Sequence, residues 1–243
     1  MLGLYDIHCH ILPGVDDGSH SMEETRELLR LEYEDGVRTI IVTPHYRVEM
    51  FEPELARIYQ AFWDTCDEAA ALAPDLKLYM GCEFHANMEM VETLKSGGRP
   101  TMAGSRYVLT EFRESSPFPY IKERVTALRT GGYRPVIAHA ERYECMRNDF
   151  DRAEELTQIG ARIQINAGSL LGDMGRSVRQ YCRELIEEDL VWYVASDAHN
   201  LKDRKPNLGK CAGWLERKYG YACAKRLLID HPEEIIRTGV RTK

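Results

Sequence analysis

The sequence lacks the segments that would place it in or across a membrane. None of its 243 residues belongs to an apolar run of about eighteen, the length that a membrane-spanning helix requires. The first residues also lack the basic and then apolar pattern of a secretory signal peptide. We therefore expect no membrane span and no export, and we expect a cytoplasmic protein.

Cysteine pairs and basic runs are missing as well. The seven cysteines are odd in number and scattered, and none forms a C-x-x-C pair, which argues against a disulfide framework or a zinc–thiolate site. The net charge is -7 and no run of Lys or Arg occurs. Nucleic acid is therefore not an expected partner, because binding to its phosphate backbone needs a basic surface.

What the sequence does contain is a regular alternation of short β-rich runs and amphipathic stretches. With 243 residues, 44% of them hydrophobic, it is long enough for one α/β domain, and we expect residues 1–243 to form a single domain. A first strand leads into His8 and His10. Further strands are expected at residues 38–43, 77–82, 107–110, 134–138, 162–166 and 191–196.

Helices are expected between these strands. Ser21 and Glu24 have capping-box spacing, in which each side chain satisfies a backbone donor of the other residue, and Gly36 ends that helix. The remaining helices are expected at residues 53–73, 115–128, 151–159, 178–188 and 206–238, the last with breaks at Gly220 and Pro232. In the least periodic segment, residues 97–100 predict a turn between short strands.

The stretch around His8 predicts the first part of a metal site. His8 and His10 share one face of an extended chain because strand side chains repeat every two residues. H-x-H alone is a weak signal, since a strand can carry two histidines without binding an ion. Asp16 and Asp17 strengthen it, because they are oxygen donors on a turn, next to Gly18, that can fold back toward the strand.

Polar donors recur at, or just past, the carboxyl end of the predicted strands. In a (β/α) barrel these strand ends meet on one face, so the donors would form one cluster. The candidates are His8, His10, Asp17, His45, Glu83, Glu111, His139, Asp197 and His199. A single His or Glu at a strand end is usually a satisfied polar group, but nine in register are poorly explained by chance. Imidazole and carboxylate donors without cysteine favour Zn, Mn or Fe, and this many donors suggests two or three ions.

The motifs in order resemble those of a known family. They are D-x-H-C-H-x-L-P-G-x-D-D-G, T-P-H, G-x-E, a Glu after residues 107–110, A-H-x-E-R-Y, N-A-G-S-L and S-D-A-H-N. Together they resemble the polymerase and histidinol phosphatase (PHP) superfamily, and within it the metal-dependent bacterial protein-tyrosine phosphatases of capsule and exopolysaccharide loci, the CpsB/YwqE family. The resemblance extends from about Leu4 to Arg204.

This resemblance implies a distorted (β/α)7 barrel with a trinuclear site, in which Mn is the first choice of metal and Fe or Zn the alternatives. One ion would be held by His8, His10, Glu83 and Asp197. A second would take Glu83 as a bridge, with Glu111 and His139. The third would be held by Asp17, His45 and His199.

The resemblance also implies how phosphate is handled. Arg142 and Arg204 match the family's phosphate-contacting arginines, although Arg142 could instead pair with Glu141 or Glu144. Ala140 departs from the family, since relatives often have Pro there, and this should alter only the loop that aims Arg142. His199, or a water on the third ion, is a candidate proton donor to the leaving group. Arg47, with Met50 and Phe51, is a candidate for the substrate rim.

Three functions follow as hypotheses. The first is a phosphatase of phosphotyrosine on a protein, with the tyrosine-rich tail of a bacterial tyrosine kinase as the expected partner. The second is a small-molecule phosphatase of the same fold, such as a histidinol phosphatase. The third is a non-catalytic metal-binding domain, against which the complete ligand set argues. A-H-x-E-R and N-A-G-S-L favour the first.

One further pattern suggests a different chemistry. Residues 211–217 fit C-x5-R, the pattern of cysteine-dependent phosphatases. They lack the small residues that would wrap backbone amides around a phosphate, and they lie in an expected helix. We therefore interpret this match as a coincidence.

Overall fold

The computed structural model describes residues 3–239, in which every expected strand stretch forms a strand. All strand pairs are parallel. One sheet has the order β1-β2-β4, and the other has the order β3-β5-β6-β7-β8-β9. The strands are β1 (Leu4–Cys9), β2 (Val37–Val42), β3 (His45–Tyr46), β4 (Lys77–Met80), β5 (Glu83–His85), β6 (Tyr107–Glu111), β7 (Arg134–Ile137), β8 (Arg162–Asn166) and β9 (Val191–Ala195).

Two of the expected strands, at residues 38–43 and 77–82, are each followed by a short strand that belongs to the other sheet. Pro44, which has no N–H to donate, separates β2 from β3, and Gly81 separates β4 from β5. A Cβ at Gly81 would lie 2.9 Å from Cγ2 of Ile41, so the close approach of the two strands requires glycine there. Backbone bonds continue across both breaks, from Gly81 N to Val42 O and from Glu83 N to Pro44 O.

The first and last strands also meet at their carboxyl ends. The N–H of Asp197 donates to His8 O at 2.8 Å, and the N–H of His10 donates to Ala198 O at 2.8 Å. The predicted α/β class is confirmed. Within residues 3–239 the continuous strand ladders form two parallel sheets and do not show one closed barrel.

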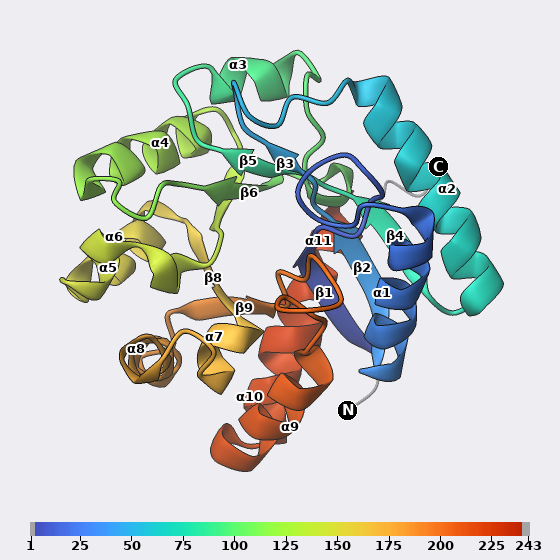
Figure 1. Ribbon diagram of the computed structural model, residues 1–243. Helices are drawn as coiled ribbons and strands as arrows, with labels where there is room; N and C mark the ends of the chain where they lie inside the picture. The colour runs from blue at the N-terminus through green and yellow to red at the C-terminus, as the bar shows by residue number, and fades with distance from the viewer. Residues whose placement is uncertain (1–2, 240–243) are drawn as a thin grey trace.

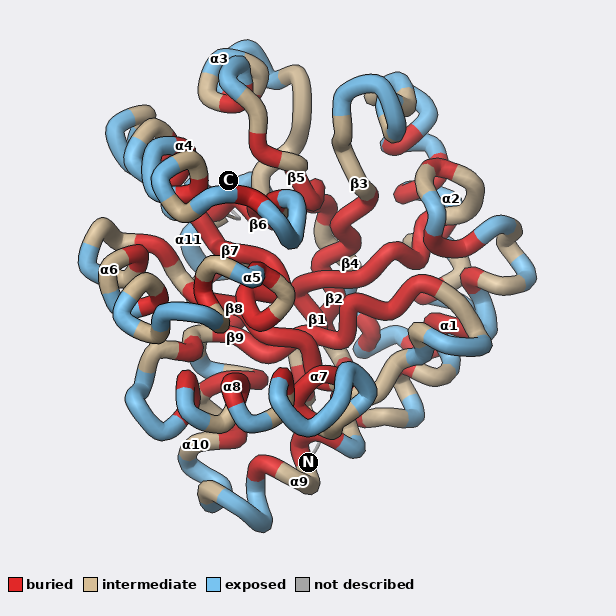
Figure 2. The backbone as a smooth tube through the Cα atoms, turned by 60° about the vertical axis from the view of Figure 1, so that its left-hand side comes forward, coloured by how far each residue is buried: buried red, intermediate tan, exposed pale blue. Residues whose placement is uncertain are grey.

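Helices surround the strands (Figure 1), and the strands are the most buried part of the chain (Figure 2). None of the helices within residues 3–239 has the length and apolar character needed to cross a membrane. The helices are α1 (Met22–Glu34), α2 (Leu55–Leu72), α3 (Met90–Lys95), α4 (Phe118–Thr130), α5 (Glu144–Arg147), α6 (Asp151–Ile159), α7 (Ala167–Leu171), α8 (Arg176–Glu187), α9 (Leu208–Tyr219), α10 (Tyr221–Lys225) and α11 (His231–Gly239), with short turns η1 (Met102–Gly104), η2 (Ala140–Arg142) and η3 (Arg226–Asp230).

The expected helices are confirmed, with three local corrections. The chain breaks at Gly220 as expected but not at Pro232, because α10, the π-helical segment η3 and α11 follow one another without a gap. The turn at residues 97–100 joins α3 to η1, not two strands, because a six-residue helix is too short to produce a recognisable period. At the start of α1, the Ser21 hydroxyl accepts from Glu24 N at 3.2 Å as expected. The Glu24 carboxylate, however, accepts from His20 N at 2.9 Å and not from Ser21.

Candidate metal centre

All nine predicted donors lie together at the carboxyl ends of the strands. Three groups have donor atoms within 4.8 Å of one another: His10, Asp17, His45 and His199; His8, His10 and Asp197; and His45, Glu83 and Glu111. His139 joins them, because its Nε2 lies 3.0 Å from Glu83 Oε1 and 3.6 Å from Glu111 Oε1. The structure therefore brings these side chains into one cluster, and their binding of ions remains a prediction.

Strand β1 and the turn after it set the first part of the cluster. The side chains of His8 and His10 lie on the same side of the strand, with their Nε2 atoms 3.2 Å apart, while Cys9 between them packs in the core. Gly18 allows the following turn to fold back, because a Cβ there would lie 2.0 Å from His10 O. The turn brings the Asp16 carboxylate to 2.8 Å from His10 Nδ1.

Asp16 is thus an orienting residue that was not among the predicted ligands. Its Oδ2 also accepts from the backbone N–H of His45 at 2.9 Å, so one carboxylate positions two candidate ligands from different strands. Burial opposes its charge, but His10 and then His45 outweigh burial and hold the pKa of Asp16 well below its usual value. Asp16 is therefore ionised, and it favours the His10 tautomer with a proton on Nδ1 and a free Nε2.

Two candidate ligands have backbone conformations that side chains rarely adopt. His139 has φ 32° and Asp197 has φ 54°, both in the left-handed region. Such conformations cost on the order of 1–3 kcal/mol each and persist where the surroundings impose them, often at functional sites. Here they turn two side chains into the cluster directly after β7 and β9.

The bonding of the cluster fits a site for cations. Four buried polar atoms in it have no hydrogen-bond partner among the described residues: His45 Nδ1, Glu83 Oε2, Asp197 Oδ1 and His199 Nε2. Nδ1 of His45 lies 3.0 Å from Glu83 Oε2 without the geometry of a hydrogen bond. Buried polar atoms almost always have a hydrogen-bond partner. Polar atoms that converge without such partners are therefore arranged as the ligands of a metal ion are.

The pKa values of two histidines also indicate that the cluster favours positive charge. Burial opposes protonation of His8, but Glu83 and Asp197 outweigh it and raise the pKa of His8 to about 9. The same competition, again with Glu83, raises the pKa of His45 to about 10. Without cations the carboxylates thus draw protons onto these imidazoles, at the positions where bound ions would supply the charge.

The other titratable members behave differently. Burial, and then Arg142, lower the pKa of His139 to about 4, while burial and then His10 lower the pKa of His199 to about 2. Both rings are therefore neutral near pH 7 and able to act as ligands. Burial and then Glu83 raise the pKa of Glu111 to about 7.

Three supporting side chains were missed from the sequence. Gln164 Oε1 lies 3.1 Å from His8 Nδ1, and Asn166 Nδ2 donates to Asp197 Oδ2 at 2.7 Å. Tyr143 Oη donates to Ala138 O at 2.9 Å, next to His139. Asn166 opens the N-A-G-S-L motif, and Gln164 precedes it by two residues on the same face of β8, so the strand period was a signal that could have found both.

Arg142 and Arg204 both contact Asp197. Nη2 of Arg142 lies 3.0 Å from Asp197 Oδ2, and Nη2 of Arg204 lies 2.7 Å from the same atom. The carboxylate partner of Arg142 is thus Asp197, and neither Glu141 nor Glu144 forms an ion pair with it in the described structure. Arg204 reaches this position because residues 199–204 form a tight loop, in which His199 N donates to Arg204 O at 2.8 Å.

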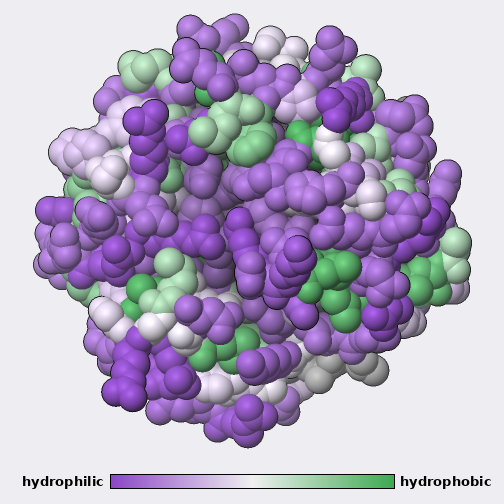
Figure 3. Space-filling view, in the orientation of Figure 1, coloured by the Kyte–Doolittle hydropathy of each residue, from purple (hydrophilic) through white to green (hydrophobic). Residues whose placement is uncertain are grey.

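Of the residues predicted for the substrate rim, Phe51 makes another contact. Phe51 stacks on the ring of His45, with centroids 5.2 Å apart and planes at 11°, so it supports a candidate ligand. Met50 is 58% exposed, and Arg47 is half-buried beside the cluster. Figure 3 shows that the face of the molecule seen in Figure 1 is mainly hydrophilic, with small and separate apolar patches.

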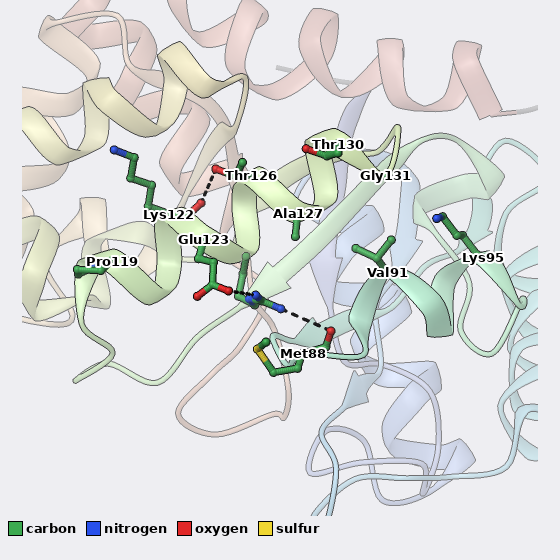
Figure 4. A pocket seen from close by; sticks show the side chains of 11 residues that line it. Met88, Val91, Lys95, Pro119, Lys122, Glu123, Thr126, Ala127, Thr130 and Gly131 are labelled. Atoms are coloured by element: carbon green, nitrogen blue, oxygen red, sulfur yellow. Dashed lines mark hydrogen bonds and ion pairs between the residues drawn. The ribbon is translucent and has the colours of Figure 1, made fainter.

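Two other features lie apart from the cluster. A groove of about 800 Å³ lies between α3 and α4 (Figure 4), and none of the nine candidate ligands lines it. Cys211, from the C-x5-R match, is fully buried in α9, while Arg217 is exposed. Six residues along a helix turn it by about 240°, so the two side chains cannot face one phosphate.

The fold and the cluster together define an α/β protein with a cluster of imidazole and carboxylate side chains at the carboxyl ends of its parallel strands. The family model described as "Capsular polysaccharide synthesis, CpsB/CapC" matches residues 4–237. The chain therefore belongs to the CpsB/CapC family, and the family predicted from the motifs is confirmed.

Individual relatives agree. The tyrosine-protein phosphatase CpsB of Streptococcus pneumoniae is 37% identical over 238 residues, covering 96% of this chain and 98% of that protein. The tyrosine-protein phosphatase YwqE of Bacillus subtilis (strain 168) is 33% identical over 219 residues, covering 89% and 85%. A solved structure from work on YwqE of Bacillus subtilis and CpsB of Streptococcus pneumoniae, described as metal-dependent tyrosine phosphatases, has a TM-score of 0.90 and 31% identity, covering 98% of this chain and 96% of its own.

Proposed function

We infer that this chain is a metal-dependent tyrosine-protein phosphatase that serves capsular polysaccharide synthesis. The enzyme class predicted from the motifs is confirmed by the relatives, which match nearly the whole chain. The observation that carries the inference is the convergence of nine imidazole and carboxylate side chains on one buried cluster with unsatisfied atoms.

We propose that the cluster holds two or three divalent ions, with Mn first and Fe or Zn as alternatives. His8, His10, Glu83 and Asp197 would hold one ion. Glu83, Glu111 and His139 would hold the second, and Asp17, His45 and His199 the third. The groups of neighbouring donors support the sets His8, His10 and Asp197, Glu83 with Glu111, and Asp17, His45 and His199. They also place His10 beside the third set and His45 beside Glu83 and Glu111. When bound, the ions supply the activation of a water and the neutralisation of charge on the phosphate.

The arginines are proposed to hold the phosphate. Arg142 and Arg204 present two guanidinium groups at one carboxylate, Asp197, next to the candidate ligands. A guanidinium can donate two parallel hydrogen bonds to phosphate oxygens, so the pair would orient the group and offset the charge that develops on it. Nδ1 of His199 lies 2.9 Å from Asp197 O, a carbonyl that only accepts, so the neutral ring holds its proton there and Nε2 has none to pass to the leaving oxygen. We therefore propose that Nε2 of His199 serves as a ligand and that a water supplies the proton to the leaving oxygen. Arg47 would contact the substrate at the rim.

The substrate is proposed to be phosphotyrosine on a protein, with the tail of a bacterial tyrosine kinase as the partner, in the cytoplasm. We further propose that residues 1–243 form one domain and that the two sheets act as one distorted (β/α)7 barrel. The backbone bonds between β1 and the segment after β9 support this arrangement.

The test is a comparison of substrates after removal and return of metal. Protein stripped by a chelator is resupplied with Mn, Fe or Zn and assayed on a tyrosine-phosphorylated peptide and on histidinol phosphate. We expect activity to return with metal and to favour the peptide. His45→Ala should abolish it without unfolding the protein, while His20→Ala, a matched change at an exposed histidine, should not.

Each other outcome contradicts part of the proposal. A preference for histidinol phosphate would make the protein a small-molecule phosphatase with the same metal centre. Hydrolysis of neither substrate by protein with all ions bound would refute phosphatase chemistry on these substrates. Full activity of the stripped protein would refute the role of metal.

A further inference from the structure

Two arginines and a histidine lie beside the candidate metal ligands at three neighbouring strands. Each follows a predicted ligand by two positions: His85 lies in β5, while Arg47 and Arg113 lie just beyond the ends of β3 and β6. The pairs are His45 with Arg47, Glu83 with His85, and Glu111 with Arg113. The register aligns His45 with Glu83, and it aligns His85 with Glu111, so Arg113 lies two positions further along than His85. Two positions along an extended chain correspond to roughly 7 Å, so each of the three side chains lies about that far along the chain from the ligand that precedes it.

The basic residues line a pocket of about 710 Å³. We call it the side pocket, and define it by Arg47, His85, Asn87, Arg113, Ser115 and Ser116, which all line it. Its floor and walls thus carry guanidinium, imidazole, amide and hydroxyl groups. These are the groups from which proteins build sites for carboxylates and phosphates.

The positive charge of the side pocket is not compensated. Within residues 3–239, neither Arg47 nor Arg113 has an ion pair with a carboxylate, whereas Arg142 and Arg204 are both held by Asp197. Glu49 also lines the pocket, but it is exposed and forms no ion pair in the described part of the chain.

His85 adds an unused polar atom. Its Nε2 is buried and has no hydrogen-bond partner among the described residues. A buried polar atom without a partner is uncommon, and it costs on the order of 1–3 kcal/mol unless a ligand or water satisfies it. In the side pocket this atom lies among groups that bind anions.

We propose that the side pocket binds an acidic group of the substrate peptide close to the phosphotyrosine, either a carboxylate or a second phosphate. This inference rests on the proposed function. An extended peptide advances about 3.3–3.6 Å per residue, so a side chain within about three positions of the phosphotyrosine reaches the side pocket while the phosphate lies at the ligands. The side pocket then selects tyrosines in acidic or multiply phosphorylated segments.

The test uses three peptides with one phosphotyrosine position in common. In the first, the residues flanking the phosphotyrosine are Gln; in the second they are Glu; in the third one of them is a second phosphotyrosine. The measured quantity is kcat/KM of the metal-loaded enzyme for each peptide at low salt, with cleavage of the common position followed by mass spectrometry. The ratio to the Gln peptide cancels any general change in activity.

The wild-type enzyme should prefer the anionic peptides by about threefold to tenfold, the range expected for a partly exposed charge-assisted contact. Arg113→Gln and Arg47→Gln should bring the ratio toward one, and Arg113→Lys should restore part of it. Lys95→Gln is the matched control, because it removes a positive charge from the α3–α4 groove instead (Figure 4). The ratio should also fall as salt screens the contact.

The three peptides and the control variant separate the possible outcomes. A larger ratio for the Glu peptide than for the doubly phosphorylated peptide assigns the pocket to carboxylates, and the reverse assigns it to phosphate. Equal rates on all three peptides, or an equal loss of preference in Lys95→Gln, would overturn the inference while leaving the phosphatase intact. Absence of hydrolysis of every peptide would instead refute the proposed function on which it rests.

Discussion

Oε1 of Gln164 lies 3.1 Å from Nδ1 of His8. The same oxygen accepts the backbone N–H of His139 at 2.9 Å. An amide oxygen accepts only, so Gln164 holds a proton on Nδ1 of His8 and leaves Nε2, which faces the cluster, as the nitrogen that would bind an ion. The amide nitrogen of Gln164 donates to Asn166 Oδ1 at 2.8 Å, and Asn166 in turn donates to Asp197. Two side chains of β8 therefore position three candidate ligands from three other strands or strand ends.

Gln164→Leu should weaken metal binding. The change keeps a side chain of similar length but removes the acceptor for His8 and the donor for Asn166, and loss of such supporting bonds typically lowers metal affinity about 10-fold to 100-fold. Isothermal titration of the stripped protein with Mn, together with metal analysis after dialysis, measures the effect. Gln158→Leu on α6 is the matched control, since Gln158 only contacts Glu154 at the surface. Equal affinity in the two variants would contradict a supporting role.

Replacement of either arginine by lysine should weaken phosphate binding. Arg142→Lys and Arg204→Lys keep the positive charge but lose the planar guanidinium, which can donate two parallel hydrogen bonds to phosphate oxygens. A hydrogen bond to a charged group contributes about 1.5–3 kcal/mol. Its loss should therefore raise the inhibition constant of inorganic phosphate about tenfold or more. Competitive inhibition of peptide hydrolysis by phosphate measures that constant. Arg217→Lys, at an exposed position of α9, is the control. An unchanged inhibition constant in both active-site variants would show that neither arginine contacts the phosphate.

Cys211→Ala should leave catalysis intact. Burial raises the pKa of the Cys211 thiol to about 12, so almost no thiolate exists near pH 7, and the thiolate is the nucleophilic form. We expect kcat/KM on the phosphopeptide to remain within about twofold of the wild-type value, because the Cys211 side chain packs in the core and takes no part in the reaction. Iodoacetamide should likewise fail to inactivate the folded enzyme through this residue. A folded variant with full metal content and no activity would restore the cysteine mechanism.

The positions of the nine donors could be predicted because each lies at the end of a β-rich run, and parallel strand ends converge whatever the details of the fold. The sequence did not reveal the short strands β3 and β5 that follow Pro44 and Gly81, since they depend on contact between neighbouring strands such as that of Gly81 with Ile41. It also did not single out Gln164, and it gave Asp16 as an oxygen donor without its role in orienting His10 and His45. Their roles depend on which imidazole nitrogen each side chain meets, and that is a property of tertiary structure.

A buried acidic pair, Glu32 and Asp6, lies behind the cluster. Glu32 of α1 is fully buried, and its carboxyl oxygens have no hydrogen-bond partner among the described residues. It faces Asp6 of β1, which accepts from the Ser196 hydroxyl and, at 3.2 Å, from Ser196 N. Burial, and then the negative charge of Asp6, raise the pKa of Glu32 well above its usual value. The folded protein therefore retains a proton that the unfolded chain releases above about pH 4.5.

This difference makes folding stability fall as the pH rises from 5 to 8, because the folded state binds more protons than the unfolded state over that range. Glu32→Gln keeps the shape of the side chain and needs no proton. We expect the variant to exceed the wild type in free energy of unfolding by a margin that grows with pH, to about 1–2 kcal/mol at pH 8. Urea denaturation of metal-free protein at pH 5, 6, 7 and 8 measures this margin. Glu27→Gln, at an exposed position of the same helix, should show a margin that does not vary with pH. A constant margin for Glu32→Gln as well would mean that Glu32 does not hold a proton in the folded protein.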